Sequence, residues 1–414
     1  ENRMSPLKLQ MELRQDRTMI TRESVAKRII EVVITAPTPE VASKRMPLNI
    51  ALVLDRSGSM EGDKLRYVQQ AACHLIDQLD AQDQVALVSF DNVTDILAPS
   101  TAVSVSQRDT LKRHVNGLHA RGGTDLFSGW LHGANEAAGH QIPNGVNRVL
   151  LLTDGQANQG ETRQTTLQHH AQELRQRGVS TSTFGVGADF NQYLLEGMAE
   201  HGGGHYYFIE HPNQVPSLFR QELGELMAVV ARSAQLEVTI PTGTSVSLLG
   251  EVPHDSSGGC LRVPLGDFFA GEKRFYYFEV LTPTSSQAVE QIFPFELLWT
   301  DSEGVPTDVV QMATFRYATE TETRAIPADT ALRGRAAEIR AAVAERTSLR
   351  LVEEGKTDEA VRTLEGIVSK YGDLLGPDKV ADLNRLRISM QMRTLSPGAA
   401  KASHNMSYAK RNSR

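Results

Sequence analysis

Residues 49–54 (NIALVL) are followed directly by residues 55–59 (DRSGS). A short run of branched apolar residues that ends at a polar, glycine-containing turn is typical of a buried parallel strand. In open α/β sheets, ligands bind at the carboxyl ends of such strands. The turn offers a carboxylate, Asp55, and two hydroxyls, Ser57 and Ser59, and contains no thiol or imidazole. The stretch therefore predicts a site for a hard divalent cation such as Mg²⁺ or Mn²⁺ and argues against zinc.

Two later stretches can complete this site. Residues 121–125 (RGGTD) are a Gly-Gly loop that can bring its backbone close to an ion and present the Thr124 hydroxyl, just before a predicted amphipathic helix. Residues 149–155 (VLLLTDG) are a second predicted buried strand, which ends in the carboxylate of Asp154 and a glycine turn. The predicted metal ligands are therefore Asp55, Ser57, Ser59, Thr124 and Asp154.

These three motifs, in this order, resemble the metal-ion-dependent adhesion site of von Willebrand factor type A (VWA) domains, with all five positions filled. The resemblance implies that the three hydroxyls ligate the metal directly and that the two carboxylates act directly or through water. It leaves the sixth position for an acidic side chain of a partner. Mg²⁺ is the expected ion, with Mn²⁺ or Ca²⁺ as alternatives. We expect Asp125 to support the site from outside, and Arg56, Met60 and Glu61 to form the rim that contacts the partner.

The resemblance continues through residues 185–208, which are similar to the closing half of bacterial VWA proteins labelled calcium-activated chloride channel-like. That label implies a transmembrane pore, whereas this chain contains no apolar run of 18 residues. Intracellular members of the family commonly work beside AAA+ ATPases or signalling kinases and phosphatases. The family also implies that metal ligation shifts the last helix of the domain, expected here at about 216–230.

Composition limits the classes of function. Lys plus Arg is 43 and Asp plus Glu is 50, so the formal net charge of −7 gives no indication of a nucleic-acid or acidic-membrane partner. The two cysteines are far apart in sequence, which does not support a disulfide framework and suits a reducing compartment. Because we find neither a signal-peptide pattern nor a transmembrane segment, we expect a cytoplasmic location.

Changes in hydrophobic period predict the domain organisation. Between residues 44 and 232, strands alternate with helices, which is typical of a doubly wound, mostly parallel six-stranded sheet. Strands predicted at 235–240, 244–249, 273–282, 290–300 and 307–317 indicate an antiparallel β-sandwich over 233–320, and two strands within 5–43 would complete it. The α/β domain is then an insertion in the sandwich. Residues 321–394 predict a helical hairpin or bundle, and 395–414 a disordered basic tail.

Three functions fit this organisation. The first is a non-enzymatic module that binds an Asp or Glu of a partner protein through the metal. The second is a hydrolase in which the metal polarises a substrate or activates water. It requires a general base near the ion, for which Asp91 and the scattered histidines are weak candidates, so we predict that the chain is not an enzyme. The third is a scaffold whose sandwich and helices carry the binding.

Overall fold

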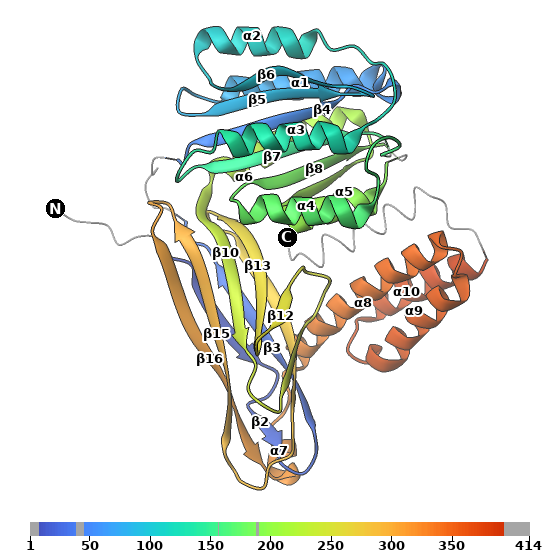
Figure 1. Ribbon diagram of the computed structural model, residues 1–414. Helices are drawn as coiled ribbons and strands as arrows, with labels where there is room; N and C mark the ends of the chain where they lie inside the picture. Colours follow the sequence, from blue (N-terminus) through green and yellow to red (C-terminus); the bar gives the residue numbers. More distant parts are fainter. Residues whose placement is uncertain (1–7, 39–44, 156, 188–189, 393–414) are drawn as a thin grey trace, which may run out of the picture.

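The computed structural model describes residues 8–38, 45–155, 157–187 and 190–392. An α/β domain lies at the top of Figure 1, a β-sandwich lies below it, and a group of C-terminal helices lies beside the sandwich. The predicted fold class is confirmed in all three parts. The predicted basic tail, 395–414, lies outside the described residues.

The α/β domain is built on one six-stranded sheet in the order β6-β5-β4-β7-β8-β9. All neighbouring strands are parallel except β6, which runs antiparallel to β5 at one edge. The strands are β4 (Leu48–Asp55), β5 (Gln84–Phe90), β6 (Thr94–Ala102), β7 (Val146–Thr153), β8 (Ser180–Val186) and β9 (Gly203–Ile209). The helices are α1 (Asp63–Gln78), α2 (Val105–Asn116), α3 (Leu126–Gly139), α4 (Gln164–Gln176), α5 (Gln192–Gly202) and α6 (Val215–Met227), with short 3₁₀ turns at η1 (Gly58–Met60) and η2 (Pro212–Gln214).

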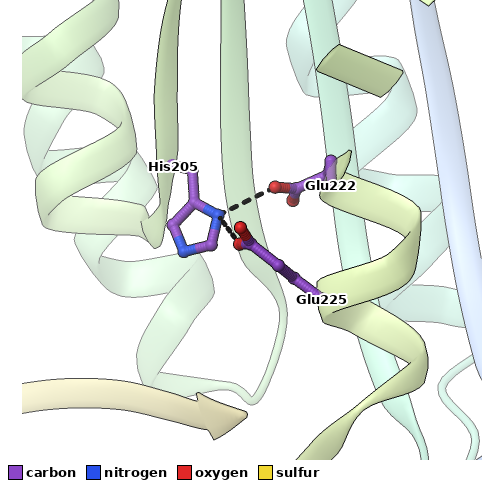
Figure 2. Close-up of side chains that lie close together, drawn as sticks. All are labelled: His205, Glu222 and Glu225. Carbon is purple, nitrogen blue, oxygen red and sulfur yellow. Dashed lines mark hydrogen bonds and ion pairs between the residues drawn. The ribbon is translucent and has the colours of Figure 1, made fainter. Parts of the chain in front are cut away.

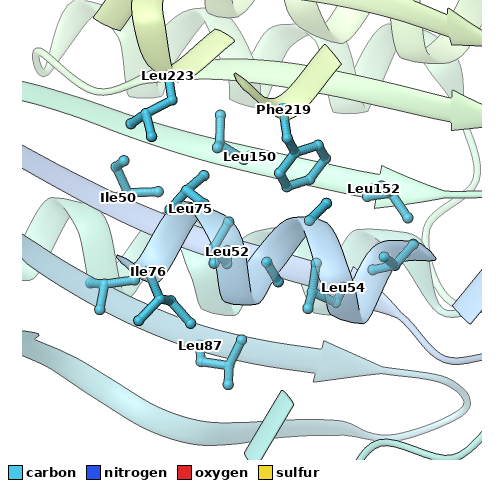
Figure 3. Packing of buried hydrophobic residues seen from close by; sticks show 14 of the residues in the cluster. Ile50, Leu52, Leu54, Leu75, Ile76, Leu87, Leu150, Leu152, Phe219 and Leu223 are labelled. Carbon is cyan, nitrogen blue, oxygen red and sulfur yellow. The ribbon is translucent and has the colours of Figure 1, made fainter. Parts of the chain in front are cut away.

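The central strand β4 is buried along its whole length because helices cover both faces of the sheet. Its side chains alternate between two cores. Ile50, Leu52 and Leu54 pack with α1, α2 and α6, as Figure 3 shows for α1 and α6, whereas Ala51 and Val53 pack with α3 on the other face. This double coverage explains why the strand is a continuous apolar run. It also fixes Asp55, the last residue of β4, at the carboxyl edge of the sheet.

The β-sandwich consists of two sheets that share one apolar core. The four-stranded sheet has the order β1-β3-β14-β11, and the six-stranded sheet has the order β12-β13-β10-β15-β16-β2. The strands are β1 (Gln10–Gln15), β2 (Met19–Thr21), β3 (Ala26–Thr35), β10 (Val229–Thr239), β11 (Ser245–Leu248), β12 (Asp255–Ser257), β13 (Cys260–Phe269), β14 (Lys273–Thr282), β15 (Glu290–Asp301) and β16 (Pro306–Ala318). As predicted, strands from before the α/β domain complete the sandwich: β3 pairs with β14, and β2 pairs with β16.

The two connections between the α/β domain and the sandwich meet at one turn, between β13 and β14. In the connection that leads from β3 into the α/β domain, the amide of Ala36 donates to the carbonyl of Glu272 at 2.8 Å. In the connection that leads from α6 back to the sandwich, the carbonyl of Ala228 accepts the amide of Ala270 at 2.8 Å. The last helix of the α/β domain, α6, ends at Met227 and not near residue 230 as expected. After one intervening residue, β10 begins.

The C-terminal helices are α7 (Glu320–Ala325), α8 (Thr330–Glu353), α9 (Thr357–Tyr371) and α10 (Pro377–Gln391). The last three share an apolar core, and the first half of α8 packs on the sandwich. Farther along α8, the Arg346 guanidinium pairs with Glu196 of α5 at 2.5 Å and with Glu251 at 3.0 Å. Helix α8 therefore contacts both other parts of the chain. Among the described residues, every helix is too short or too polar to cross a membrane.

Candidate metal centre

Asp55 is fixed by hydrogen bonds at the end of β4. Its side chain is fully buried, and its Oδ1 accepts the backbone amide of Ser57 at 2.7 Å. Its Oδ2 accepts the hydroxyl of Thr153, the last residue of the neighbouring strand β7, at 2.5 Å. Burial raises the pKa of the Asp55 carboxyl to about 6, although these hydrogen bonds favour its charged form. A cation beside this carboxylate would compensate for the cost of burying it.

The hydroxyls of the 55–59 turn link it to Asp154. The Ser57 and Ser59 oxygens are 3.1 Å apart, and the Ser59 hydroxyl donates to Asp154 Oδ1 at 2.6 Å. Asp154 directly follows β7 and is fully buried. Its other oxygen, Oδ2, accepts the ammonium group of Lys64 in α1. Four of the five predicted ligands thus lie in one hydrogen-bonded group at the ends of adjacent strands.

Backbone contacts bring the Gly-Gly loop to the same place. The amide of Gly58 donates to the carbonyl of Gly122 at 3.0 Å, and the amide of Arg121 donates to the carbonyl of Arg56 at 2.8 Å. Thr124 is 3% exposed. A Cβ atom added to Gly155 would lie 3.1 Å from Thr124 Oγ1, a tight contact, so the glycine lets this hydroxyl approach the residue after Asp154 closely. The predicted ligands from all three sequence motifs are therefore neighbours.

The donor set fits a hard divalent cation. All five side chains offer oxygen, and the two oxygen separations in the group, 3.1 Å and 2.6 Å, bracket the spacing of adjacent ligands around octahedral Mg²⁺, about 2.9 Å for bonds of about 2.0–2.1 Å. The two carboxylates carry the charge needed to neutralise such an ion, and the hydroxyls add neutral donors.

Two residues predicted to form the rim are placed elsewhere. Met60 is fully buried in the core beneath α1, because the η1 turn directs its side chain inward. The Arg56 guanidinium is also buried, where it pairs with Asp91 at 2.8 Å and with Asp95. Both predictions of a partner-contacting role are therefore wrong. Glu61 is exposed beside the turn, as a rim residue must be.

The predicted supporting residue, Asp125, holds the start of α3. Its Oδ1 accepts the amide of Ser128 at 3.0 Å, and its own amide donates to the carbonyl of Asp91 at 2.8 Å. Asp91 is 3% exposed and pairs with Arg121 at 2.7 Å as well as with Arg56. Burial alone would raise the pKa of Asp91, but the hydrogen bonds from the two arginines hold it below the ordinary value. This makes Asp91 a weak candidate for a general base.

Sequence reasoning missed two contributors to the site. Thr153 orients Asp55 by a hydrogen bond. Its position directly before Asp154 was the only feature of the sequence that pointed to this role. Lys64 pairs with Asp154, yet in the sequence it is an ordinary lysine in the first turn of a predicted amphipathic helix. The pairing joins residues 90 positions apart and arises only when α1 packs beside the end of β7.

The fold and site define an open α/β domain with oxygen-bearing side chains that converge at the carboxyl ends of its central strands. Residues 49–221 match the family model of the von Willebrand factor type A domain. The chain therefore carries a VWA domain, a type of domain that serves generally as a protein-interaction module.

Similar proteins support this assignment. Over 273 residues, 63% of either chain, the sequence is 28% identical to the uncharacterized protein sll0103 of Synechocystis sp.. Over 261 residues it is 27% identical to the uncharacterized protein YfbK of Escherichia coli, covering 60% of this chain and 44% of YfbK. The chain spans less than two thirds of the length of both relatives. A solved von Willebrand factor type A structure from Catenulispora acidiphila has the same fold, with a TM-score of 0.71 and 19% identity over 92% of this chain and 90% of that one.

Proposed function

We propose that the chain is a non-enzymatic, metal-dependent protein-interaction module with a metal-ion-dependent adhesion site. Asp55, Ser57, Ser59, Thr124 and Asp154 would hold the ion, with Mg²⁺ as the expected species and Mn²⁺ or Ca²⁺ as alternatives. The single observation that carries this proposal is the convergence of Ser57, Ser59 and Asp154 through contacts of 3.1 Å and 2.6 Å at the end of β4.

When bound, the ion would supply an electrophilic position open to an Asp or Glu carboxylate of the partner. The residues of the chain prepare this position. Thr153 and the Ser57 amide orient Asp55, and the two serines and Thr124 supply neutral oxygens, so the site keeps affinity for one further negative charge. The exposed Glu61 and Arg121 beside it would select the partner's surface by charge.

The partner and its setting belong to the same proposal. We place the protein in the cytoplasm of a bacterium, as an adaptor or regulator related to the calcium-activated chloride channel-like VWA proteins. The partner would be a protein with an accessible acidic residue, such as an AAA+ ATPase or a signalling protein. The similarity to bacterial proteins sll0103 and YfbK over about 60% of the chain supports this setting.

A pull-down tests the proposal. Wild-type chain and a Thr124→Ala variant serve as baits for a bacterial lysate, with washes in Mg²⁺ and elution by EDTA. We expect EDTA to release a partner from wild type and at least tenfold less from Thr124→Ala, because one ligand is lost. A Thr165→Ala variant, changed at an exposed position of α4, should behave as wild type. Equal release from all three baits would contradict a metal-bridged interaction.

A second test concerns the position of the domains. Helix α6 is followed after one residue by β10, so a shift of α6 on ligation would be transmitted to the sandwich. Small-angle scattering with Mg²⁺, with and without a peptide that presents an accessible glutamate, should therefore give different curves. Identical curves at saturating peptide would contradict the coupling but not the binding.

A further inference from the structure

A second group of ligating side chains lies at the opposite end of the α/β domain, where it meets the sandwich. His205 projects from β9, and Glu222 and Glu225 project from α6 (Figure 2). One oxygen of each carboxylate approaches the same imidazole nitrogen, His205 Nδ1, at 2.8 Å for Glu222 and 2.9 Å for Glu225. The nitrogen and the two oxygens all lie within 4.8 Å of one another. His205 is 4% exposed and Glu222 is fully buried, so the direct contacts lie in a largely dry setting.

A single proton cannot satisfy this arrangement. One N–H on Nδ1 can be directed at one carboxylate oxygen, but two converge on it. The second of them, Glu225 Oε2, is buried and makes no hydrogen bond among the described residues. Two carboxylates held together in a dry setting repel each other strongly unless a cation lies between them. A protonated imidazole supplies one such positive charge. A metal ion shared by all three side chains would supply it as well, and would also engage the second oxygen.

The outer oxygens of both carboxylates accept hydrogen bonds from other side chains, and the inner oxygens are directed at His205. The inner oxygen of Glu222 also accepts the hydroxyl of Tyr207 at 2.8 Å. Glu222 Oε1 accepts the hydroxyl of Ser182 at 2.6 Å, and Glu225 Oε1 accepts the amide of Gln221 at 3.1 Å. The Arg148 guanidinium lies 3.8 Å from the outer oxygen of Glu222 and also pairs with Asp267 at 3.4 Å. Ligating carboxylates in metal sites are typically held by such outer contacts.

We propose that His205, Glu222 and Glu225 form a binding site for a transition-metal ion of the Zn²⁺ type. Zinc accepts both imidazole nitrogen and carboxylate oxygen as ligands, whereas Mg²⁺ prefers oxygen alone. Ligands of a tetrahedral zinc ion are about 3.3 Å apart for bonds of about 2.0–2.1 Å. The separations of 2.8 Å and 2.9 Å thus need to widen by only a few tenths of an ångström.

The site would join α6 to β9 at the junction of the domains. The side chain of Glu225 is 28% exposed and gives an entry route from solvent. His205 also lines a partly open pocket of about 100 Å³ between the α/β domain and the sandwich, which can hold water for a fourth ligand. This site is independent of the proposed adhesion site, since its ligands differ in kind and lie at the other end of the strands.

Zinc binding to the full chain tests the proposal. The experiments use a Thr124→Ala background, so that the Asp55 site contributes little. After dialysis against micromolar ZnCl₂, we expect one equivalent of zinc per chain and, with Co²⁺ as a substitute, the visible absorption of a tetrahedral cobalt site. Adding Glu225→Gln should weaken zinc binding at least tenfold and abolish that absorption. This change keeps the size of a partly exposed side chain, so the protein should remain folded.

Two comparisons make the outcome decisive. Glu210→Gln, the same substitution at an exposed position, should leave zinc binding unchanged. His205→Ala should lose the cobalt absorption, and circular dichroism shows whether it folds. Zinc binding that is absent from the Thr124→Ala chain, or unaffected by Glu225→Gln, would overturn the proposal and leave His205 as an ion-pair partner of the two glutamates. Neither result bears on Mg²⁺ binding at Asp55.

Discussion

A Lys64→Met variant should bind Mg²⁺ about tenfold more tightly than the wild-type chain, a gain of about 1.4 kcal/mol. The Lys64 ammonium donates to Asp154 Oδ2, so it shares the carboxylate that we propose ligates the metal. A positive charge at this position repels a second cation and must be displaced or shared when the ion binds. Its side chain is 26% exposed, and solvent screening keeps the expected gain modest. Isothermal titration calorimetry with MgCl₂ measures the change.

The matched variant Asp154→Asn should have the opposite effect. It keeps the shape of the side chain but removes one of the two carboxylate charges, so Mg²⁺ affinity should fall at least a hundredfold. Lys112→Met, at another partly exposed lysine paired with an aspartate, controls for the loss of a positive charge far from the site. Unchanged affinity in Lys64→Met, with Asp154→Asn inactive, would show that the ammonium moves aside without cost.

Arg148→Met should lower the free energy of unfolding by about 3–5 kcal/mol, the range for breaking a buried ion pair. The Arg148 side chain is 1% exposed and lies on β7 at the junction with the sandwich. It donates to Ser182 at 3.1 Å and lies 3.8 Å from Glu222 and 3.4 Å from Asp267. Methionine fills much of the same space but leaves Glu222 buried with fewer compensating charges. Urea unfolding followed by fluorescence and circular dichroism measures the loss.

Arg163→Met provides the comparison. Arg163 also pairs with a glutamate, Glu161, at 2.7 Å, but its side chain is 76% exposed. Exposed ion pairs contribute little, so this variant should remain within about 0.5 kcal/mol of wild type. Equal effects of the two substitutions would mean that Arg148 stabilises the protein only through its aliphatic part.

Much of the fold could be predicted from the sequence because strands buried on both faces are continuous apolar runs. Residues 49–54 and 149–152 have this pattern, and the structure places them side by side in the sheet. The strand Cys260–Phe269 was not predicted, since Pro264 and Gly266 interrupt its alternation. Strand β12 pairs only with Cys260–Arg262, so the rest of this strand has a free edge on that side, where proline is tolerated. The strands β2 and β12 have three residues each, too few for a period.

For the site, the sequence indicated ligand types but not the direction of every side chain. Met60 follows the polar turn directly and was expected to face a partner, yet the turn buries it. Arg56 was expected at the rim, yet two aspartates, one directly after β5 and one on β6, hold it inside. The histidine and glutamates at the junction were not predicted as a group. His205 lies on a strand 17 or more residues before the two glutamates, which lie on a helix, and only the packing of α6 against the sheet brings them together.

The meeting of both connections at the turn between β13 and β14 has a mechanical consequence. A pull on the metal edge of the α/β domain would reach the sandwich through β3 and β10 in parallel. Each of these is an interior strand, β3 between β1 and β14, and β10 between β13 and β15. To draw either strand out, whole rows of hydrogen bonds on both of its sides would have to break together. The sandwich therefore shares tension between the two strands β3 and β10 instead of concentrating it on one of them.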